Sequence, residues 1–122
     1  MKKILIADDH PLFRDGLHSL LEARGIEVVG EAKNGREAVE QTRRLRPDVV
    51  LMDLEMPDMD GIEATRALPG TAVVVLTSFS DRERILAALD AGARGYLLKD
   101  ADPDELARAI RAAARGDAPL DP

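Results

Sequence analysis

Side chains that could carry out chemistry follow short apolar runs at four places in this sequence. They are two adjacent carboxylates, a third carboxylate, a hydroxyl and an ammonium: Asp8 and Asp9, Asp53, Thr77, and Lys99. If the apolar runs are parallel strands, their carboxyl ends meet at one edge of a sheet, which is where ligands bind in such folds. The sequence therefore predicts one shared pocket for groups that are far apart along the chain.

The composition of this set favours a particular chemistry. Carboxylates that lie close together repel one another, so a cation compensates them or one of them stays protonated. The chain has no cysteine, and we interpret His10 and His18 as helix residues without a metal role, so the ligands are oxygen atoms that suit Mg²⁺, with Mn²⁺ as a substitute. An ammonium and a hydroxyl suit a phosphoryl group. Asp53 is then the natural nucleophile for phosphoryl transfer to a carboxylate.

The elements that must position these groups follow from the spacing of the apolar runs. Five runs begin 22 to 24 residues apart, an interval that suits one strand plus one crossover helix. They span residues 4–7, 26–29, 49–52, 73–76 and 96–98. Glu27 interrupts the second run, which predicts an edge strand, whereas the first, third and fourth runs are uniformly apolar, as central strands are. We therefore expect five strand-helix units.

The segments between the runs show helical spacing and carry capping residues at their starts. Four of the starts pair an Asn, Asp or Ser with a glutamate three positions later. The pairs are Asn34 with Glu37, Asp60 with Glu63, Ser80 with Glu83, and Asp102 with Glu105. The third helix, expected over 61–68, is short because Pro69 and Gly70 end it.

The overall composition sets bounds on the function. The 122 residues predict one domain. They carry 17 basic and 23 acidic side chains, a net charge of −6 that argues against free-standing nucleic-acid binding. The absence of cysteine fits a reducing compartment, and the first apolar run is too short for a signal or membrane-spanning segment, so we expect a cytoplasmic protein without a membrane partner.

The combination of these residues resembles a known family. Its carriers are Asp8 and Asp9 after an apolar run, the segment 53–61 (DLEMPDMDG), Thr77, and the segment 95–99 (GYLLK). Over essentially its whole length the chain resembles the receiver domain of two-component response regulators. The segment 9–17 (DHPLFRDGL) is similar to the subfamily that precedes a LuxR-type helix-turn-helix. This resemblance implies a flavodoxin-like (βα)5 sandwich of three layers, with a parallel sheet in the order 2-1-3-4-5.

The resemblance also implies roles for the site residues. Asp53 accepts a phosphoryl group from a sensor histidine kinase. Asp9, Asp53 and the backbone carbonyl of Glu55 hold Mg²⁺, and Asp8 acts mainly through water. Lys99 pairs with the phosphoryl oxygens, Thr77 moves toward them, and Tyr96 turns inward to change the surface.

At the level of the whole protein, the resemblance implies a signalling domain with Mg²⁺-dependent self-phosphorylation and slow self-dephosphorylation. We attribute the slow step to Phe79, which could restrict the attacking water. Phosphorylation would promote homodimerisation, through a helical face that could include the first and fifth helices, and DNA would be bound by a separate helix-turn-helix domain. We assign residues 1–116 to the receiver and 117–122 to the start of a linker.

Some features leave alternatives open. Asp100 stands where many receivers have proline after a cis peptide bond, so that bond is undecided. Taken singly, the acidic residues could be helix caps or turn residues, Thr77 a strand end, Lys99 a surface cation and Tyr96 core. A haloacid-dehalogenase-type phosphatase is the nearest enzyme alternative, although its first strand should end Asp-x-Asp. An FMN-binding flavodoxin is the second alternative, but the loop after the first apolar run lacks the Ser, Thr and Gly donors that bind a phosphate. A receiver-like module that is not phosphorylated is the third alternative.

Overall fold

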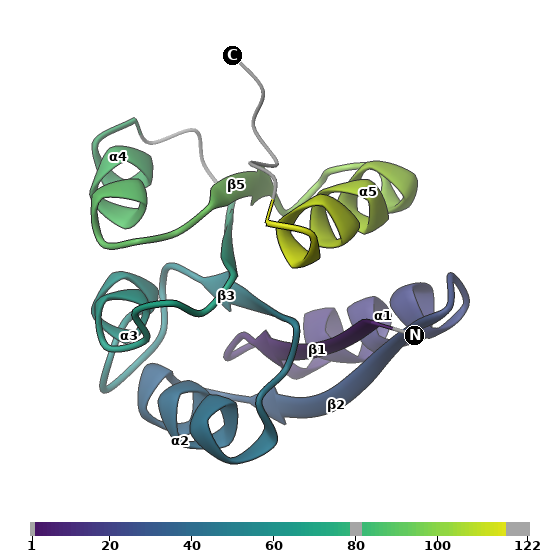
Figure 1. Ribbon diagram of the computed structural model, residues 1–122, viewed down its shortest axis with the longest axis horizontal. Helices are drawn as coiled ribbons and strands as arrows, with labels where there is room; N and C mark the ends of the chain where they lie inside the picture. Colours follow the sequence, from purple (N-terminus) through teal and green to yellow (C-terminus); the bar gives the residue numbers. More distant parts are fainter. Residues whose placement is uncertain (1, 79–81, 117–122) are drawn as a thin grey trace.

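The computed structural model describes residues 2–78 and 82–116, which form a five-stranded parallel sheet between two layers of helices (Figure 1). The elements alternate along the chain: β1 Lys2–Ala7, α1 Pro11–Glu22, β2 Ile26–Ala32, α2 Gly35–Leu45, β3 Val49–Asp53, α3 Gly61–Arg66, β4 Val73–Thr77, α4 Arg82–Asp90, β5 Gly95–Leu98 and α5 Pro103–Ala114. The strand order is β2-β1-β3-β4-β5. This is a flavodoxin-like fold, and the predicted fold class is confirmed.

The two faces of the sheet have separate apolar cores. Alternate residues of β1, β3 and β4 point to opposite faces, so each of these strands contributes to both cores. One core includes residues of α1 and α5, and the other includes residues of α2, α3 and α4. β3 and β4 are buried along their whole length, as expected for central strands with helices on both sides.

β2 is longer than its apolar run suggests. It continues through Gly30 and Glu31 to Ala32 and contains a register shift, because Ile4 pairs with Val28 while Leu5 pairs with Gly30. The additional residue is tolerated because β2 lies at the edge of the sheet.

The helix starts largely follow the predicted caps. The side chain of Asn34 accepts a hydrogen bond from the Glu37 N–H, and that of Asp60 accepts one from the Glu63 N–H. Asp102 caps α5 through Asp104 N–H, one position earlier than the predicted partner. The predicted cap at Ser80 lies outside the described residues. α3 ends at Arg66, two residues before the expected end, and is the shortest helix of the described chain.

Candidate functional site

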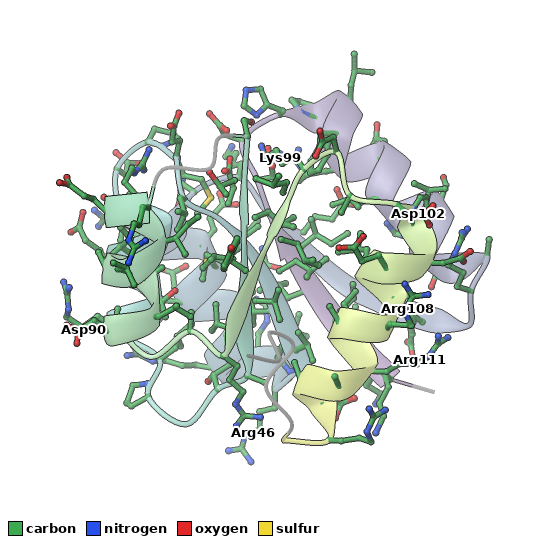
Figure 2. The ribbon with its side chains drawn as sticks, turned by 90° about the horizontal axis from the view of Figure 1, so that it is seen from above. Arg46, Asp90, Lys99, Asp102, Arg108 and Arg111 are labelled. Atoms are coloured by element: carbon green, nitrogen blue, oxygen red, sulfur yellow. The ribbon has the colours of Figure 1, made fainter. Side chains whose placement is uncertain are left out.

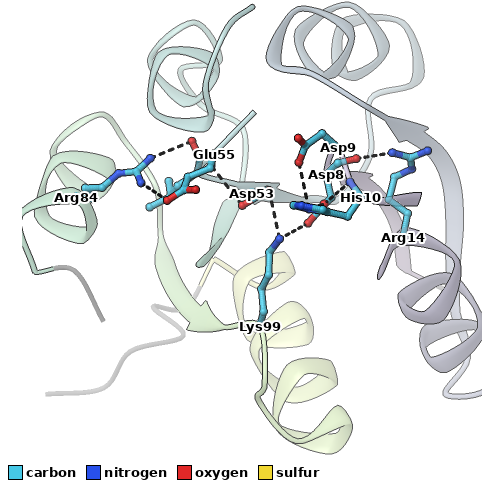
Figure 3. A network of polar contacts seen from close by, with 9 residues as sticks. Asp8, Asp9, His10, Arg14, Asp53, Glu55, Arg84 and Lys99 are labelled. Atoms are coloured by element: carbon cyan, nitrogen blue, oxygen red, sulfur yellow. Dashed lines mark hydrogen bonds and ion pairs between the residues drawn. The ribbon is translucent and has the colours of Figure 1, made fainter. Parts of the chain in front are cut away.

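The carboxyl edge of the sheet brings three of the predicted site residues into contact (Figure 3). Lys99 Nζ lies 2.7 Å from Asp8 Oδ2 and 3.2 Å from Asp53 Oδ2. β1 and β3 are neighbours in register, with Ala7 opposite Met52, so Asp8 and Asp53 follow at adjacent strand ends. Lys99 follows β5 and is held by its backbone N–H, which donates to the Thr77 carbonyl at 2.9 Å. The parallel topology therefore assembles a buried ion-pair group from three separate strands.

This group is almost completely removed from water. Asp8 is 0% exposed and Asp53 is 3% exposed. Burial, and then the charge of Asp8, raise the pKa of Asp53 to about 6, although Lys99 and the Glu55 N–H oppose the shift. Burial alone would lower the pKa of Lys99, but its hydrogen bond to Asp8 and the charges of Asp53 and Asp8 outweigh that effect and raise it. One ammonium thus only partly compensates the neighbouring carboxylates.

The acidic residues fit a site for a hard divalent cation. Oxygen atoms of Asp8, Asp9 and Asp53 and a nitrogen of His10 lie within 4.8 Å of one another. Three buried carboxylate oxygens, Asp8 Oδ2, Asp9 Oδ1 and Asp53 Oδ2, accept no hydrogen bond from the described residues other than Lys99 and His10. Lys99 Nζ lies beside Asp8 Oδ2 and Asp53 Oδ2, and His10 Nδ1 lies beside Asp9 Oδ1. Carboxylate oxygens with few donors of their own are the ligands that Mg²⁺ prefers.

His10 belongs to this cluster, although the sequence analysis gave it no part in the site. Its Nδ1 lies 2.9 Å from Asp8 Oδ1 and 3.2 Å from Asp9 Oδ1, and its backbone N–H donates to Asp8 Oδ1. It precedes α1 as the N-cap residue. Its position directly after the acidic pair was a signal that could have found it. His18 lies on α1 and instead contacts Glu31 on β2, with 2.9 Å between Nδ1 and Oε2.

The other predicted residues lie around the same edge. Thr77 is buried at the end of β4, one position beyond the residue that pairs with Asp53. The Glu55 N–H donates to Asp53 Oδ1 at 3.3 Å, which places the Glu55 backbone beside that carboxylate. Tyr96 is half-buried on β5 and packs against the core on the side of α2, α3 and α4. The peptide bond between Lys99 and Asp100 is trans.

A close backbone contact fixes the segment between β3 and α3. The Gly61 N–H donates to the Leu54 carbonyl at 3.2 Å. A Cβ atom at position 61 would lie 2.2 Å from the Asp53 carbonyl oxygen, so only glycine fits there. Asp58 adopts a positive φ of 66° within the same segment. The loop that follows Asp53 is therefore held close to its strand end.

Arg84 is a second residue of the site that the sequence analysis missed. It reaches from α4 to the segment after β3, where Nη1 lies 2.6 Å from Glu55 Oε1 and Nη2 donates to the Leu54 carbonyl at 3.3 Å (Figure 3). No strand-end pattern could have found it, because it lies within a helix 29 positions from Glu55.

Two hollows differ in their relation to this chemistry. A pocket of about 420 Å³ opens at the carboxyl edge and is lined by Asp9, His10, Leu54, Glu55, Met56, Asp60 and Arg84. A larger groove of about 840 Å³ lies at the opposite edge and includes Arg46 and Arg94. Figure 2 shows Lys99 and Arg46 at opposite ends of the molecule. The larger groove is therefore remote from the buried carboxylates.

Comparison with known proteins gives consistent matches. The family model described as the response regulator receiver domain matches residues 4–111. The uncharacterized transcriptional regulatory protein YhcZ of Bacillus subtilis (strain 168) is 50% identical over 111 residues, which cover 87% of this chain and 52% of that protein. The transcriptional regulatory protein LiaR of the same organism is 48% identical over 126 residues, covering 99% of this chain and 60% of LiaR.

A solved structure supports the same assignment. The two-component response regulator of the LuxR family from Aurantimonas sp. SI85-9A1 superposes with a TM-score of 0.91 at 39% identity, covering 97% of this chain and 88% of that chain.

Within residues 2–78 and 82–116, no helix is long and apolar enough to cross a membrane.

These matches decide between the open interpretations of the fold. The chain spans between about half and three fifths of the length of the curated relatives YhcZ and LiaR. The phosphatase and flavodoxin alternatives are set aside, because the receiver domain model matches residues 4–111 of the chain. The chain belongs to the response regulator receiver domain family and is similar to the receivers of LuxR-type regulators.

Proposed function

We propose that this chain is the phosphoacceptor unit of a transcriptional response regulator and that a sensor histidine kinase phosphorylates it on Asp53. The observation that carries this proposal is the buried Asp53 carboxylate, whose Oδ2 lies 3.2 Å from Lys99 Nζ and accepts no hydrogen bond from any other described residue. A carboxylate in this state is available to attack an electrophile. The same geometry argues against a receiver-like module that is not phosphorylated.

The reaction is a transfer of a phosphoryl group between two nucleophiles. A carboxylate oxygen of Asp53 forms a bond to phosphorus, and the bond between phosphorus and the kinase histidine nitrogen breaks. The electron pair of that bond stays on the histidine ring. Lys99, 14% exposed in its side chain and adjacent to Asp53, pairs with the phosphoryl oxygens, and Thr77 donates its hydroxyl to them. With a small donor such as acetyl phosphate, the chain carries out the same step by itself.

Mg²⁺, for which Mn²⁺ can substitute, is the metal that fits the oxygen set. Asp9, Asp53 and the backbone carbonyl of Glu55 would hold it, and Asp8 would act mainly through water. When bound, the ion neutralises charge on the phosphoryl oxygens. The three buried carboxylate oxygens without good donors support this assignment.

The switch proceeds from the new charge to the surface. Thr77 moves toward the phosphoryl group, and Tyr96 turns into the space that opens, which changes the surface formed by α4, β5 and α5. Tyr96 is half-buried, so an inward turn would bury more of its ring. A coupling of about 1–3 kcal/mol is the usual scale for such a two-state change.

An apolar groove between α1 and α5 supports homodimerisation through these helices. It measures about 190 Å³ and includes Phe13, Leu20 and Leu98, and the neighbouring Leu12 side chain is 87% exposed. Lys99 Nζ lies 4.7 Å from the centre of the Phe13 ring. A change in the partners of Lys99 at the phosphorylation site would therefore reach a residue that lines this groove.

The output of the whole protein follows from its relatives. YhcZ and LiaR are named transcriptional regulatory proteins and are longer than this chain. We assign residues 1–116 to the receiver and 117–122, which lie outside the described residues, to a linker. A helix-turn-helix beyond it would bind DNA, the receiver itself would not, and the cytoplasm is the expected compartment.

Intact-mass measurement after incubation with acetyl phosphate and Mg²⁺ tests the central proposal. The wild-type chain is expected to gain the mass of one phosphoryl group, and Asp53→Ala to gain none. An equal gain in both chains would place the acceptor elsewhere, and no gain in either would support the module that is not phosphorylated.

Sedimentation with and without a phosphoryl mimic tests the proposed homodimerisation. An unchanged mass at high concentration would contradict it.

The lifetime of the phosphorylated form is a separate proposal. Self-dephosphorylation is expected to be slow because Phe79 restricts the attacking water, although Phe79 lies outside the described residues. Phe79→Ala is expected to lose its phosphoryl group faster than the wild-type chain, measured by intact mass over time. An unchanged rate would count against a role for this side chain.

A further inference from the structure

The contacts of Arg84 tie α4 to the loop that borders the acceptor pocket. Its guanidinium forms an ion pair with Glu55 at 2.6 Å and also donates to the Leu54 carbonyl at 3.3 Å. Both contacts are on the segment that directly follows Asp53, whose Oδ1 accepts from the Glu55 N–H. Figure 3 shows Arg84 and Glu55 on one side of Asp53 and the group of Asp8, Asp9 and His10 on the other.

The charges around the pocket explain why the ion pair between Arg84 and Glu55 matters. The walls of the 420 Å³ pocket include the carboxylates of Asp9, Glu55 and Asp60, and the arginine of this lining is Arg84. Glu55 is 60% exposed in its side chain and Arg84 is 34% exposed. A phosphodonor such as acetyl phosphate arrives as a dianion, so a carboxylate at the entrance whose charge is not balanced opposes its approach.

We propose that Arg84 is a positioning residue that holds and neutralises Glu55 at the entrance of the pocket, and so keeps the pocket accessible to doubly charged phosphodonors. This inference rests on the proposed phosphorylation of Asp53. It adds no chemical step: the Asp53 oxygen bonds to phosphorus, the bond to acetate breaks, and acetate leaves with the electron pair. Arg84 acts on the approach of the donor through Glu55.

A purely structural role for Arg84 makes a different prediction. If Arg84 only anchors the Leu54 carbonyl, the charge at position 55 is irrelevant, and removal of that charge cannot repair a variant that lacks the guanidinium. If Arg84 acts by neutralising Glu55, removal of the carboxylate restores the rate. Arg84→Gln is the suitable variant, because glutamine keeps a donor for Leu54 and removes the positive charge.

The experiment measures the rate of acetyl phosphate-dependent phosphorylation by intact mass, in low salt with Mg²⁺. Arg84→Gln is expected to be slower than the wild-type chain by about three- to fivefold, the range of a partly exposed ion pair. The double variant Arg84→Gln with Glu55→Gln is expected to recover most of the rate. Glu55→Gln alone is expected to be faster than the wild-type chain, because Arg84 keeps its positive charge beside the pocket.

Matched controls separate this inference from general effects. Arg82→Gln makes the same charge change on the same helix and is expected to leave the rate unchanged. The deficit of Arg84→Gln is expected to shrink in high salt and with phosphoramidate, a donor with less negative charge. Thermal unfolding by circular dichroism checks that each variant is folded.

Each outcome bears on one proposal. If the wild-type chain gains no phosphoryl group, the proposed function fails. If the wild-type chain is phosphorylated and Arg84→Gln reacts at the same rate, or if the double variant stays as slow as Arg84→Gln, the role of Arg84 is refuted while the function of Asp53 stands.

Discussion

Replacing Asp53 with asparagine is expected to stabilise the metal-free fold at neutral pH. The Asp53 side chain is buried beside Asp8, and its pKa is raised from 3.8 to about 6. The folded chain therefore binds this proton more tightly than the unfolded chain does. The resulting stabilisation is fully present below about pH 4 and is lost as the pH rises through about 6.

The size of the effect follows from the same shift. A shift of about two pKa units corresponds to about 3 kcal/mol, since each unit is worth about 1.4 kcal/mol. Asparagine has nearly the shape of protonated aspartate and does not titrate. The free energy of unfolding of Asp53→Asn is therefore expected to match that of the wild-type chain near pH 4 and to exceed it by up to about 3 kcal/mol above pH 7.

Urea unfolding monitored by circular dichroism, in low salt with a chelator, measures this difference at several pH values. Asp100→Asn is the matched control, because Asp100 is exposed next to the same edge, and it is expected to change stability by less than about 0.5 kcal/mol. A wild-type chain as stable as Asp53→Asn at neutral pH, or a difference that does not shrink toward pH 4, would refute the view that ionised Asp53 is under electrostatic strain.

Other changes around the pocket give further tests by urea or thermal unfolding. Mg²⁺ is expected to raise the urea midpoint of the wild-type chain and to raise that of Asp53→Asn much less, because the metal binds the folded carboxylates; equal shifts would contradict the metal set. Lys99→Met is expected to lower stability by about 3 kcal/mol near neutral pH, since it leaves Asp8 and Asp53 without the ammonium, and by less near pH 4; a loss independent of pH would contradict this. Gly61→Ala is expected to cost about 2 kcal/mol because of its contact with the Asp53 carbonyl. Its control, Gly16→Ala, meets nothing within 4 Å in α1 and is expected to gain about 0.5–1 kcal/mol.

The elements of the fold could be predicted because local signals and tertiary packing agree along most of the chain. The exception is the end of β2, where Gly30 and Glu31 have low strand propensity. They are held in the sheet by pairing with Leu5 and Ile6 of β1, and a preference of this kind arises only once the neighbouring strand is in place. The early end of α3 is a similar case, because the exit of a two-turn helix depends on its packing.

The candidate site was predictable to the extent that it depends on strand ends. Asp8, Asp53, Thr77 and Lys99 each end or follow a strand, and topology alone brings them to one edge. His10 and Arg84 were missed for different reasons. His10 stands next to its partners in the sequence, but a histidine near a helix start has a common structural explanation. The contact of Arg84 with Glu55 depends on the rotation and tilt of α4, which no periodicity in the sequence specifies.

Under the proposed function, the electrostatics of this edge connect the stability of the chain to its response to phosphorylation. Asp8 and Asp53 share one ammonium, and the cost of ionising Asp53 is about 3 kcal/mol in the metal-free state. That cost is on the scale of the 1–3 kcal/mol by which ligands usually shift two-state proteins. Under the proposed function, a change in charge at Asp53 would supply free energy on the scale needed to shift the surface formed by α4, β5 and α5. Asp53→Asn is then expected to gain stability at neutral pH and, because it lacks the proposed acceptor carboxylate, to give no response to phosphodonors.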